Sequence, residues 1–123
     1  MCHKVILSLA SNRFQVKNLS RARQCLREIL LDLHFTSELW TEPLGNSCRH
    51  DNYLNQLATG TTTLDEDTLN TRLKRIEADF GRNEQKRRLG IVPIDLDILA
   101  FDGERRHLHD WERTYVQALL VEL

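Results

Sequence analysis

Residues Thr63–Gly81 read TLDEDTLNTRLKRIEADFG, and this stretch carries the clearest structural signal in the chain. Its apolar side chains recur every three or four residues, which places them on one face of a helix. These side chains are Leu69, Leu73, Ile76 and Phe80. Thr63 and Glu66 have the Thr-x-x-Glu spacing of a capping box, which predicts the helix start, and Gly81 predicts its end. The stretch therefore predicts an amphipathic helix.

Hydrophobic patterns on either side of this helix predict the other elements. Strands are expected at His3–Ala10, Phe35–Thr41, Tyr53–Thr62 and Asp95–Phe101, with a first helix after an N-cap at Asn18, a basic loop from Gly81 to Pro93, and a last helix within Asp110–Leu123. The order β-α-β-β-α-β is the ferredoxin-like pattern, in which two helices cover one face of an antiparallel sheet. We therefore expect an α+β, ferredoxin-like sandwich with an additional C-terminal helix.

Length and composition favour one globular domain over residues 1–123, because 41% of the residues are hydrophobic and 28% are charged. Every apolar run is shorter than the roughly 20 residues of a membrane span, and Val5–Leu9 is too short for a signal-peptide core. Cys2, Cys25 and Cys48 have no C-x-x-C spacing, which argues against a disulfide framework and a zinc knuckle. A cytoplasmic monomer without a membrane partner is expected.

Basic residues concentrate in one part of the chain. Seven basic and three acidic residues lie between Arg72 and Arg88, a local charge of +4 in a chain whose net charge is −1. A local basic patch on an otherwise acidic molecule favours a small anionic ligand over a long nucleic acid. A solvated helix end is an alternative explanation that composition leaves open.

The segment Asp95-Leu96-Asp97 places two carboxylates on one face of a predicted strand, because side chains two residues apart point the same way, about 7 Å apart. Such a pair suits Mg²⁺, which takes one or two carboxylates and completes its shell with water and phosphate oxygens. Arginines and lysines just upstream could bind phosphate: Arg82, Lys86, Arg87 and Arg88. Together they predict a triphosphate site, although a strand that only exposes an acidic face is also possible.

A second candidate surface comprises Thr41–Gly45 and Asp51–Asn55. Tyr53 supplies an aromatic face, and the amide of Asn55 can both donate and accept hydrogen bonds. These groups suit a flat heterocycle with donors and acceptors along its edge. An ordinary turn followed by a strand would have the same composition.

Short motifs in a fixed order connect the chain to a known family. They are Ser11-Asn12 after the first strand, Thr41-x-Pro43-Leu44-Gly45, Tyr53-Leu54-Asn55, Arg75-Ile76-Glu77, Gly81-Arg82, Arg88-x-Gly90, Asp95-Leu96-Asp97-Ile98, and the set His107, Arg113 and Tyr115. In this order the chain resembles the 6-hydroxymethyl-7,8-dihydropterin pyrophosphokinases of folate biosynthesis. The likeness extends over nearly the whole chain.

The resemblance implies that ATP gives its terminal diphosphate to the hydroxymethyl oxygen of a reduced pterin and that AMP leaves. Asp95 and Asp97 would hold two Mg²⁺ ions, and Arg82 with Arg88 would steady the phosphate charge. The ATP side would consist of Glu77, Arg82, Arg88, Ile98, His107 and Arg113. The pterin would be held by Thr41, Pro43, Leu44, Tyr53, Asn55 and Tyr115, with Tyr115 stacked on its ring. The partners implied are two small molecules and no nucleic acid.

The signature loop departs from the family pattern. Leu89 stands where the family has an aromatic residue beside the pterin. Val92 stands where the family has a second arginine, and Glu84 stands where it has another basic residue. Loss of one such donor can cost on the order of a hundredfold in rate, which Lys86 or Arg87 would have to compensate. Three hypotheses stay open: a pyrophosphokinase, slowed or not; a homologue that binds nucleotide or pterin without transfer; and a ferredoxin-like regulatory or RNA-binding module.

Overall fold

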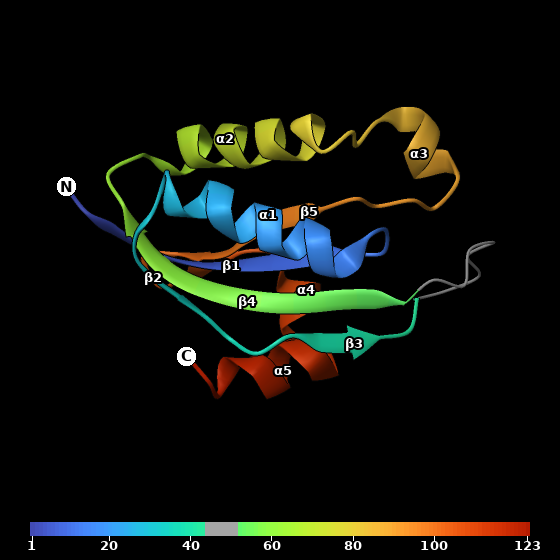
Figure 1. The fold of residues 1–123 in the computed structure, drawn as a ribbon. Coiled ribbons are helices and arrows are strands. Elements are labelled where there is room, and N and C mark those ends of the chain that lie inside the picture. Colours follow the sequence, from blue (N-terminus) through green and yellow to red (C-terminus); the bar gives the residue numbers. More distant parts are fainter. Residues whose placement is uncertain (44–51) are drawn as a thin grey trace.

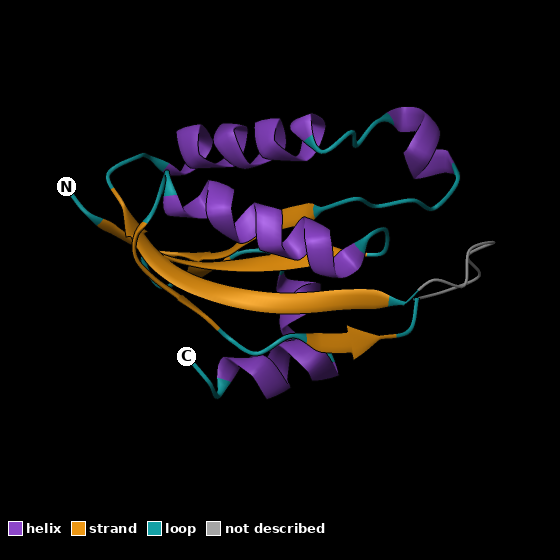
Figure 2. Cartoon of the chain, in the orientation of Figure 1, coloured by secondary structure: helices purple, strands orange, loops and turns teal. Residues whose placement is uncertain are grey.

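The computed structural model describes residues 1–43 and 52–123, which form two layers of helices around one sheet (Figures 1 and 2). Its strands are β1 (His3–Ser11), β2 (Leu31–Phe35), β3 (Leu39–Thr41), β4 (Tyr53–Thr62), β5 (Asp95–Phe101) and β6 (Glu104–Arg105). Its helices are α1 (Gln15–Arg27), α2 (Glu66–Asp79), α3 (Glu84–Arg88), α4 (Leu108–Trp111) and α5 (Thr114–Leu120).

Within the described residues, six strands form one antiparallel sheet in the order β2-β4-β1-β5-β6, and β3 extends the sheet along the other part of β4. Helices α1 and α2 lie over one face of the sheet, whereas α4 and α5 lie against the opposite face (Figure 1). The mixed α+β class and the ferredoxin-like arrangement expected from the sequence are confirmed.

Alternation along β1 and β5 divides the apolar side chains between two cores. Leu7, Leu96 and Ile98 pack in the larger core beneath α1 and α2. Leu99 packs on the other face, with Trp111 and other side chains from α4 and α5. This division leaves the polar alternates of the central strands on the α4 and α5 side of the sheet, where a site can form.

The bounds of two strands, Tyr53–Thr62 and Asp95–Phe101, agree with the sequence-based expectation, but both helix starts were wrong. The first helix starts at Gln15, and Asn18 is a buried residue within it whose side-chain amide donates to the carbonyls of Arg13 and Pro93. The second starts after Asp65, whose carboxylate accepts from the Thr68 amide at 2.8 Å. An acidic N-cap two residues downstream thus replaces the expected capping box.

The expected strand Phe35–Thr41 is two strands, β2 and β3, separated at a buried Thr36. The hydroxyl of Thr36 accepts from the Leu57 amide at 2.9 Å, so a side chain interrupts the ladder to β4. The expected C-terminal helix is also divided, into α4 and α5, because Arg113 is extended between them. The expected loop from Gly81 to Pro93 contains α3, which begins after an Asn83 side-chain cap, and β6 was not expected.

Candidate active site

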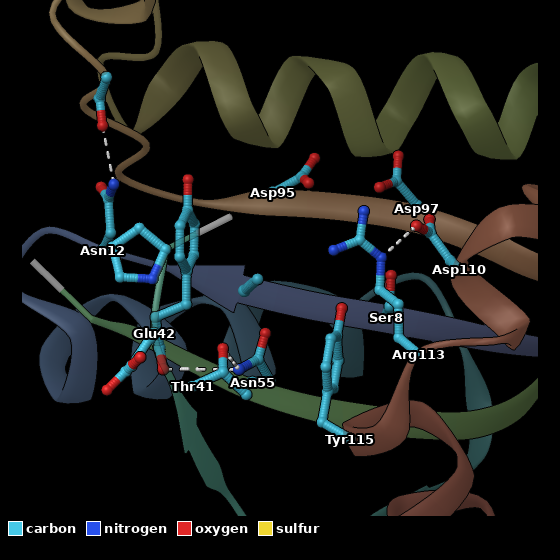
Figure 3. Close-up of a pocket in the computed structure, with 14 residues that line it drawn as sticks. Ser8, Asn12, Thr41, Glu42, Asn55, Asp95, Asp97, Asp110, Arg113 and Tyr115 are labelled. Carbon is cyan, nitrogen blue, oxygen red and sulfur yellow. Dashed lines mark hydrogen bonds and ion pairs between the residues drawn. The ribbon is translucent and has the colours of Figure 1, made fainter. Parts of the chain in front are cut away.

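One cavity of about 310 Å³ opens on the face of the sheet that α4 and α5 partly cover (Figure 3). Its walls come from the ends of four strands, the loops beside them and the two C-terminal helices. The lining residues are Ser8, Ala10, Asn12, Thr41, Glu42, Pro43, Tyr53, Asn55, Gly90, Asp95, Asp97, Asp110, Arg113 and Tyr115. The two candidate surfaces inferred from the sequence therefore meet in a single cavity.

Asp95 and Asp97 project into this cavity from β5, while Leu96 between them points into the core. Asp95 Oδ1 lies 2.9 Å from Arg82 Nη1, and Asp97 Oδ1 lies 3.2 Å from Lys74 Nζ. Burial raises the pKa of Asp97, as does the charge of Asp95, while Lys74 acts in the opposite direction. A raised pKa means that the two carboxylates resist holding both negative charges together, which is typical of a site completed by a cation.

The charge of the cavity lining also favours a bound cation. Four of the lining residues are acidic: Glu42, Asp95, Asp97 and Asp110. Among the lining residues that the structure describes, Arg113 is the one basic side chain, and its Nε donates to Asp110 Oδ1 at 2.9 Å. A polyphosphate would be repelled by this lining unless divalent cations bound first. Among the described residues no cluster of three or more His, Cys, Asp and Glu side chains could hold a metal, so a cation here would rest on the carboxylate pair and outside ligands.

Glu77 and Ile98, both expected on the ATP side, do not line the cavity. Ile98 is 4% exposed and belongs to the core beneath α1 and α2. The carboxylate of Glu77 is buried behind β5, where Oε2 accepts from the Leu96 amide at 2.8 Å and Oε1 lies 3.1 Å from Arg82 Nη1. Burial raises the pKa of Glu77, against the lowering effects of the Leu96 amide and Lys74. The protein itself thus occupies both oxygens.

The two arginines expected at the phosphates differ in position. Arg82 lies beside the cavity on Asp95, whereas the Arg88 side chain is 79% exposed on α3 and has Glu84 as its neighbour, Nε to Oε1 at 3.6 Å. His107, at the start of α4, is close to the site, with Nε2 3.9 Å from Asp97 Oδ1. Arg82, His107 and Arg113 therefore surround the carboxylate pair, and Arg88 lies apart from it.

The end of the cavity expected to hold the heterocycle contains Thr41, Pro43, Tyr53, Asn55 and Tyr115. The Asn55 amide nitrogen donates to Leu39 O at 3.0 Å and to Thr41 Oγ1 at 2.9 Å, which fixes the side-chain amide. Burial raises the pKa of both tyrosines, so both hydroxyls stay protonated at neutral pH. Leu44, the remaining residue expected here, lies outside the described residues.

Several lining residues were not among the expected site residues, and Asn12 is the clearest case. Its amide nitrogen donates to Gly90 O at 2.7 Å, and its amide oxygen accepts from Val92 N at 2.7 Å. These bonds fasten the loop after α3 to the end of β1 and bring Gly90 into the lining. Ser8 and Asp110 were also missed. Alternation in β1 could have revealed Ser8, whereas the three-residue spacing to Arg113 was the signal for Asp110.

In the part of the chain that the structure describes, each helix is too short or too polar to cross a membrane. The cavity's combination of a carboxylate pair with a fixed amide and aromatic rings argues for a small-molecule site.

Comparison with known proteins accounts for this combination. The family model for 7,8-dihydro-6-hydroxymethylpterin-pyrophosphokinase (HPPK) matches residues 6–123. A "Folate synthesis bifunctional protein" of Arabidopsis thaliana is 33% identical in an alignment covering 98% of this chain and 27% of that protein. A mitochondrial protein of the same name from Pisum sativum is 31% identical, with 98% and 25% covered. The chain thus spans about a quarter of the length of these relatives. The resemblance noted from its motifs is confirmed: the chain belongs to the 7,8-dihydro-6-hydroxymethylpterin-pyrophosphokinase family.

Proposed function

We propose that this protein transfers diphosphate from ATP to the hydroxymethyl group of 6-hydroxymethyl-7,8-dihydropterin and releases AMP, as a step of folate biosynthesis. Membership of the family supports the reaction. The observation that carries the proposal is that the carboxylates of Asp95 and Asp97 line the same cavity as Asn55 and Tyr115. One cavity can therefore hold a polyphosphate end beside a flat ring, which transfer between two bound substrates requires.

The residues present fit Mg²⁺, and we propose that two ions bind at Asp95 and Asp97. Asp95 and Asp97 both offer hard carboxylate oxygens. Among the described residues, the ion pairs of Asp95 and of Asp97 are made through Oδ1 and not through Oδ2. When bound, the ions would neutralise the triphosphate and align the oxygens between which the diphosphate moves. The acidic lining would then become a surface that accepts an anion.

Positive side chains around the carboxylates would hold the phosphates. Asp110 binds Nε of Arg113, so the two terminal nitrogens of that guanidinium are directed away from Asp110 and towards β5 (Figure 3). Arg82 lies beside Asp95, at 2.9 Å, and His107 lies near Asp97, at 3.9 Å. Arg82 already contacts Asp95, so it would lie close to a phosphate bound near that carboxylate. We assign binding of the phosphate charge to Arg82 and Arg113, and we place His107 on the nucleotide side of the cavity.

At the other end, the Asn55 amide would recognise the edge of the pterin. Its nitrogen is engaged by Leu39 O and Thr41 Oγ1, so its oxygen is presented as an acceptor for ring N–H groups. Tyr115 would stack on the ring and exclude water from the hydroxymethyl oxygen that attacks ATP. Transfer would then need only an in-line approach of that oxygen, with no covalent intermediate on the protein.

A second candidate function is binding of nucleotide and pterin without transfer. The observation that favours it is the loop after Arg82: Leu89 and Val92 replace the family's aromatic and arginine, and Arg88 is exposed on α3. Such a protein would retain the cavity and lack part of the charge that stabilises the transition state.

One assay separates the two candidates. The protein is incubated with ATP, Mg²⁺ and 6-hydroxymethyl-7,8-dihydropterin, and pterin-dependent AMP is measured. AMP formation supports the transferase, provided that it disappears in the Asp95→Ala/Asp97→Ala variant. Calorimetric binding of a non-hydrolysable ATP analogue without AMP formation supports the binding protein. Failure to bind the analogue in the presence of Mg²⁺ would refute both.

A further inference from the structure

The strand that carries the candidate metal ligands has an open edge at the site. β6 pairs with β5 only at Ala100 and Phe101. Among the described residues, β1 is the one strand that pairs with β5 over residues 95–98. In residues 1–43 and 52–123 no strand pairs with the opposite edge of this segment, although the segment carries both Asp95 and Asp97.

Side chains from α2 take the place of that strand. Glu77 Oε2 accepts a hydrogen bond from Leu96 N at 2.8 Å, and Lys74 Nζ donates to Leu96 O at 2.9 Å. Lys74 Nζ and Glu77 Oε2 are also 3.0 Å apart. Lys74 and Glu77 are one helical turn apart, so they face the strand together. Between them they satisfy both backbone groups of Leu96, as one residue of a neighbouring strand would.

The same two side chains extend to both carboxylates. Lys74 Nζ lies 3.2 Å from Asp97 Oδ1. Glu77 Oε1 lies 3.1 Å from Arg82 Nη1, which in turn contacts Asp95 Oδ1 at 2.9 Å. The side chain of Glu77 is 7% exposed, so its own contacts with Lys74 and Arg82 are shielded from water on the Glu77 side. Lys74 and Glu77 therefore hold the backbone of Leu96. Lys74 also contacts Asp97 directly, and Glu77 is linked to Asp95 through Arg82.

We propose that Lys74 and Glu77 form an edge clamp, a side-chain substitute for a missing strand, that positions Asp95 and Asp97 for a divalent metal. The inference rests on the proposed function for the identity of the ligands. It assigns Glu77 a positioning role on β5 in place of contact with ATP. Partners that orient metal ligands in this way affect metal affinity by about tenfold to a hundredfold when they are replaced.

The test compares four variants of the whole protein by two measurements that need no turnover. Hydrogen exchange at the Leu96 amide is followed by NMR, and the affinity for Mn²⁺ alone is followed by paramagnetic resonance. Glu77→Leu should speed Leu96 exchange at least about tenfold, because the amide loses its acceptor, whereas Glu77→Gln keeps an acceptor and should stay near the wild type. Lys74→Met should weaken Mn²⁺ binding about tenfold, and Lys74→Arg should restore it.

Glu66→Gln is the matched control. Glu66 lies on the same helix and pairs with Arg106 at 2.8 Å, but it does not line the cavity. This variant should leave Leu96 exchange and Mn²⁺ affinity unchanged. If Glu77→Leu fails to fold, Lys74→Met decides, because it replaces a side chain that is 43% exposed, whereas Glu77→Leu replaces one that is 7% exposed.

A purely electrostatic role for Lys74 makes the opposite prediction. Removal of a cation beside the carboxylates would then tighten Mn²⁺ binding. Tighter binding of Mn²⁺ in Lys74→Met would overturn the clamp. Unchanged Leu96 exchange and unchanged Mn²⁺ affinity in both Lys74→Met and Glu77→Leu would also overturn it.

The same measurements separate the clamp from the proposed function. If the clamp variants behave as expected and the wild type forms no AMP, the clamp stands and the transferase fails. If AMP forms and the variants match the wild type, the clamp alone fails. A wild type that binds no Mn²⁺ refutes both.

Discussion

The two ends of β5 are stabilised in different ways. At the far end, Ala100 and Phe101 pair with β6, and Asp102 closes the turn by bonding His3 Nδ1 at 2.6 Å and Lys4 N at 3.0 Å. At the site end, side chains from α2 cover the edge and the outward carboxylates line a cavity. The comparison teaches how a strand can present functional side chains. Where side chains replace the backbone partners of one strand edge, no neighbouring strand blocks access to the functional groups on that strand.

The largest expected effect lies at the site end. The Asp95→Ala/Asp97→Ala variant should lose pterin-dependent AMP formation by at least about a thousandfold, because the ions that neutralise ATP would lose their protein ligands. The measurement is AMP release at saturating substrates, with circular dichroism to verify the fold. Residual AMP above one per cent of the wild type would show that the carboxylates of β5 do not carry the chemistry.

The next effect separates two arginines that follow the same helix. Arg82→Met should lower kcat about a hundredfold, because its guanidinium contacts Asp95 beside the cavity. Arg88→Met should lower it less than tenfold, since that side chain is exposed on α3. Paired kcat measurements are decisive. A larger loss in Arg88→Met would mean that α3 approaches the substrates during turnover.

A smaller effect, in the opposite direction, is expected after α3. Val92→Arg should raise kcat by on the order of tenfold, because it returns a positive group near the phosphates. The bond that holds this loop, from Val92 N to Asn12 Oδ1, uses the backbone and survives the change. Val92→Met is the control for side-chain size. If both variants equal the wild type, the departure at this position has no bearing on the rate.

The smallest effect belongs to the far end. The bond with His3, together with the Lys4 amide, lowers the pKa of Asp102. The stabilisation is therefore present above the normal carboxyl pKa and is lost as the pH falls through the lowered value. Asp102→Asn should melt slightly below the wild type at pH 7, with a difference that shrinks towards pH 3. AMP formation should not change, and a loss of activity would contradict the separation of the two ends.

Local patterns predicted some features of the fold and site well. Strict alternation placed Asp95 and Asp97 on one face of a strand whose bounds agree with the structure. The same rule places Ile98 with Leu96 in the core, as the structure has it, whereas the family resemblance had placed Ile98 beside ATP. A functional expectation drawn from a motif therefore yields to the strand's geometry when the two disagree.

Loops and caps were predicted least well. Several side chains could cap a helix, so the choice of Asp65 over Thr63 depended on how the chain leaves β4. The break between β2 and β3 depended on the Thr36 hydroxyl reaching the Leu57 amide, a contact between residues 21 positions apart. Neither is visible in a window of a few residues.

By itself, the sequence determined the α+β class, the amphipathic α2 and the outward pair of carboxylates, because periodicity acts between near neighbours in the chain. Only the tertiary structure decided that Asn12 would fasten the loop at Gly90, that Arg88 would lie apart from Arg82, and that Glu77 would turn to Leu96. Those outcomes depend on which unsatisfied backbone groups packing brings within reach, and no local pattern encodes that proximity.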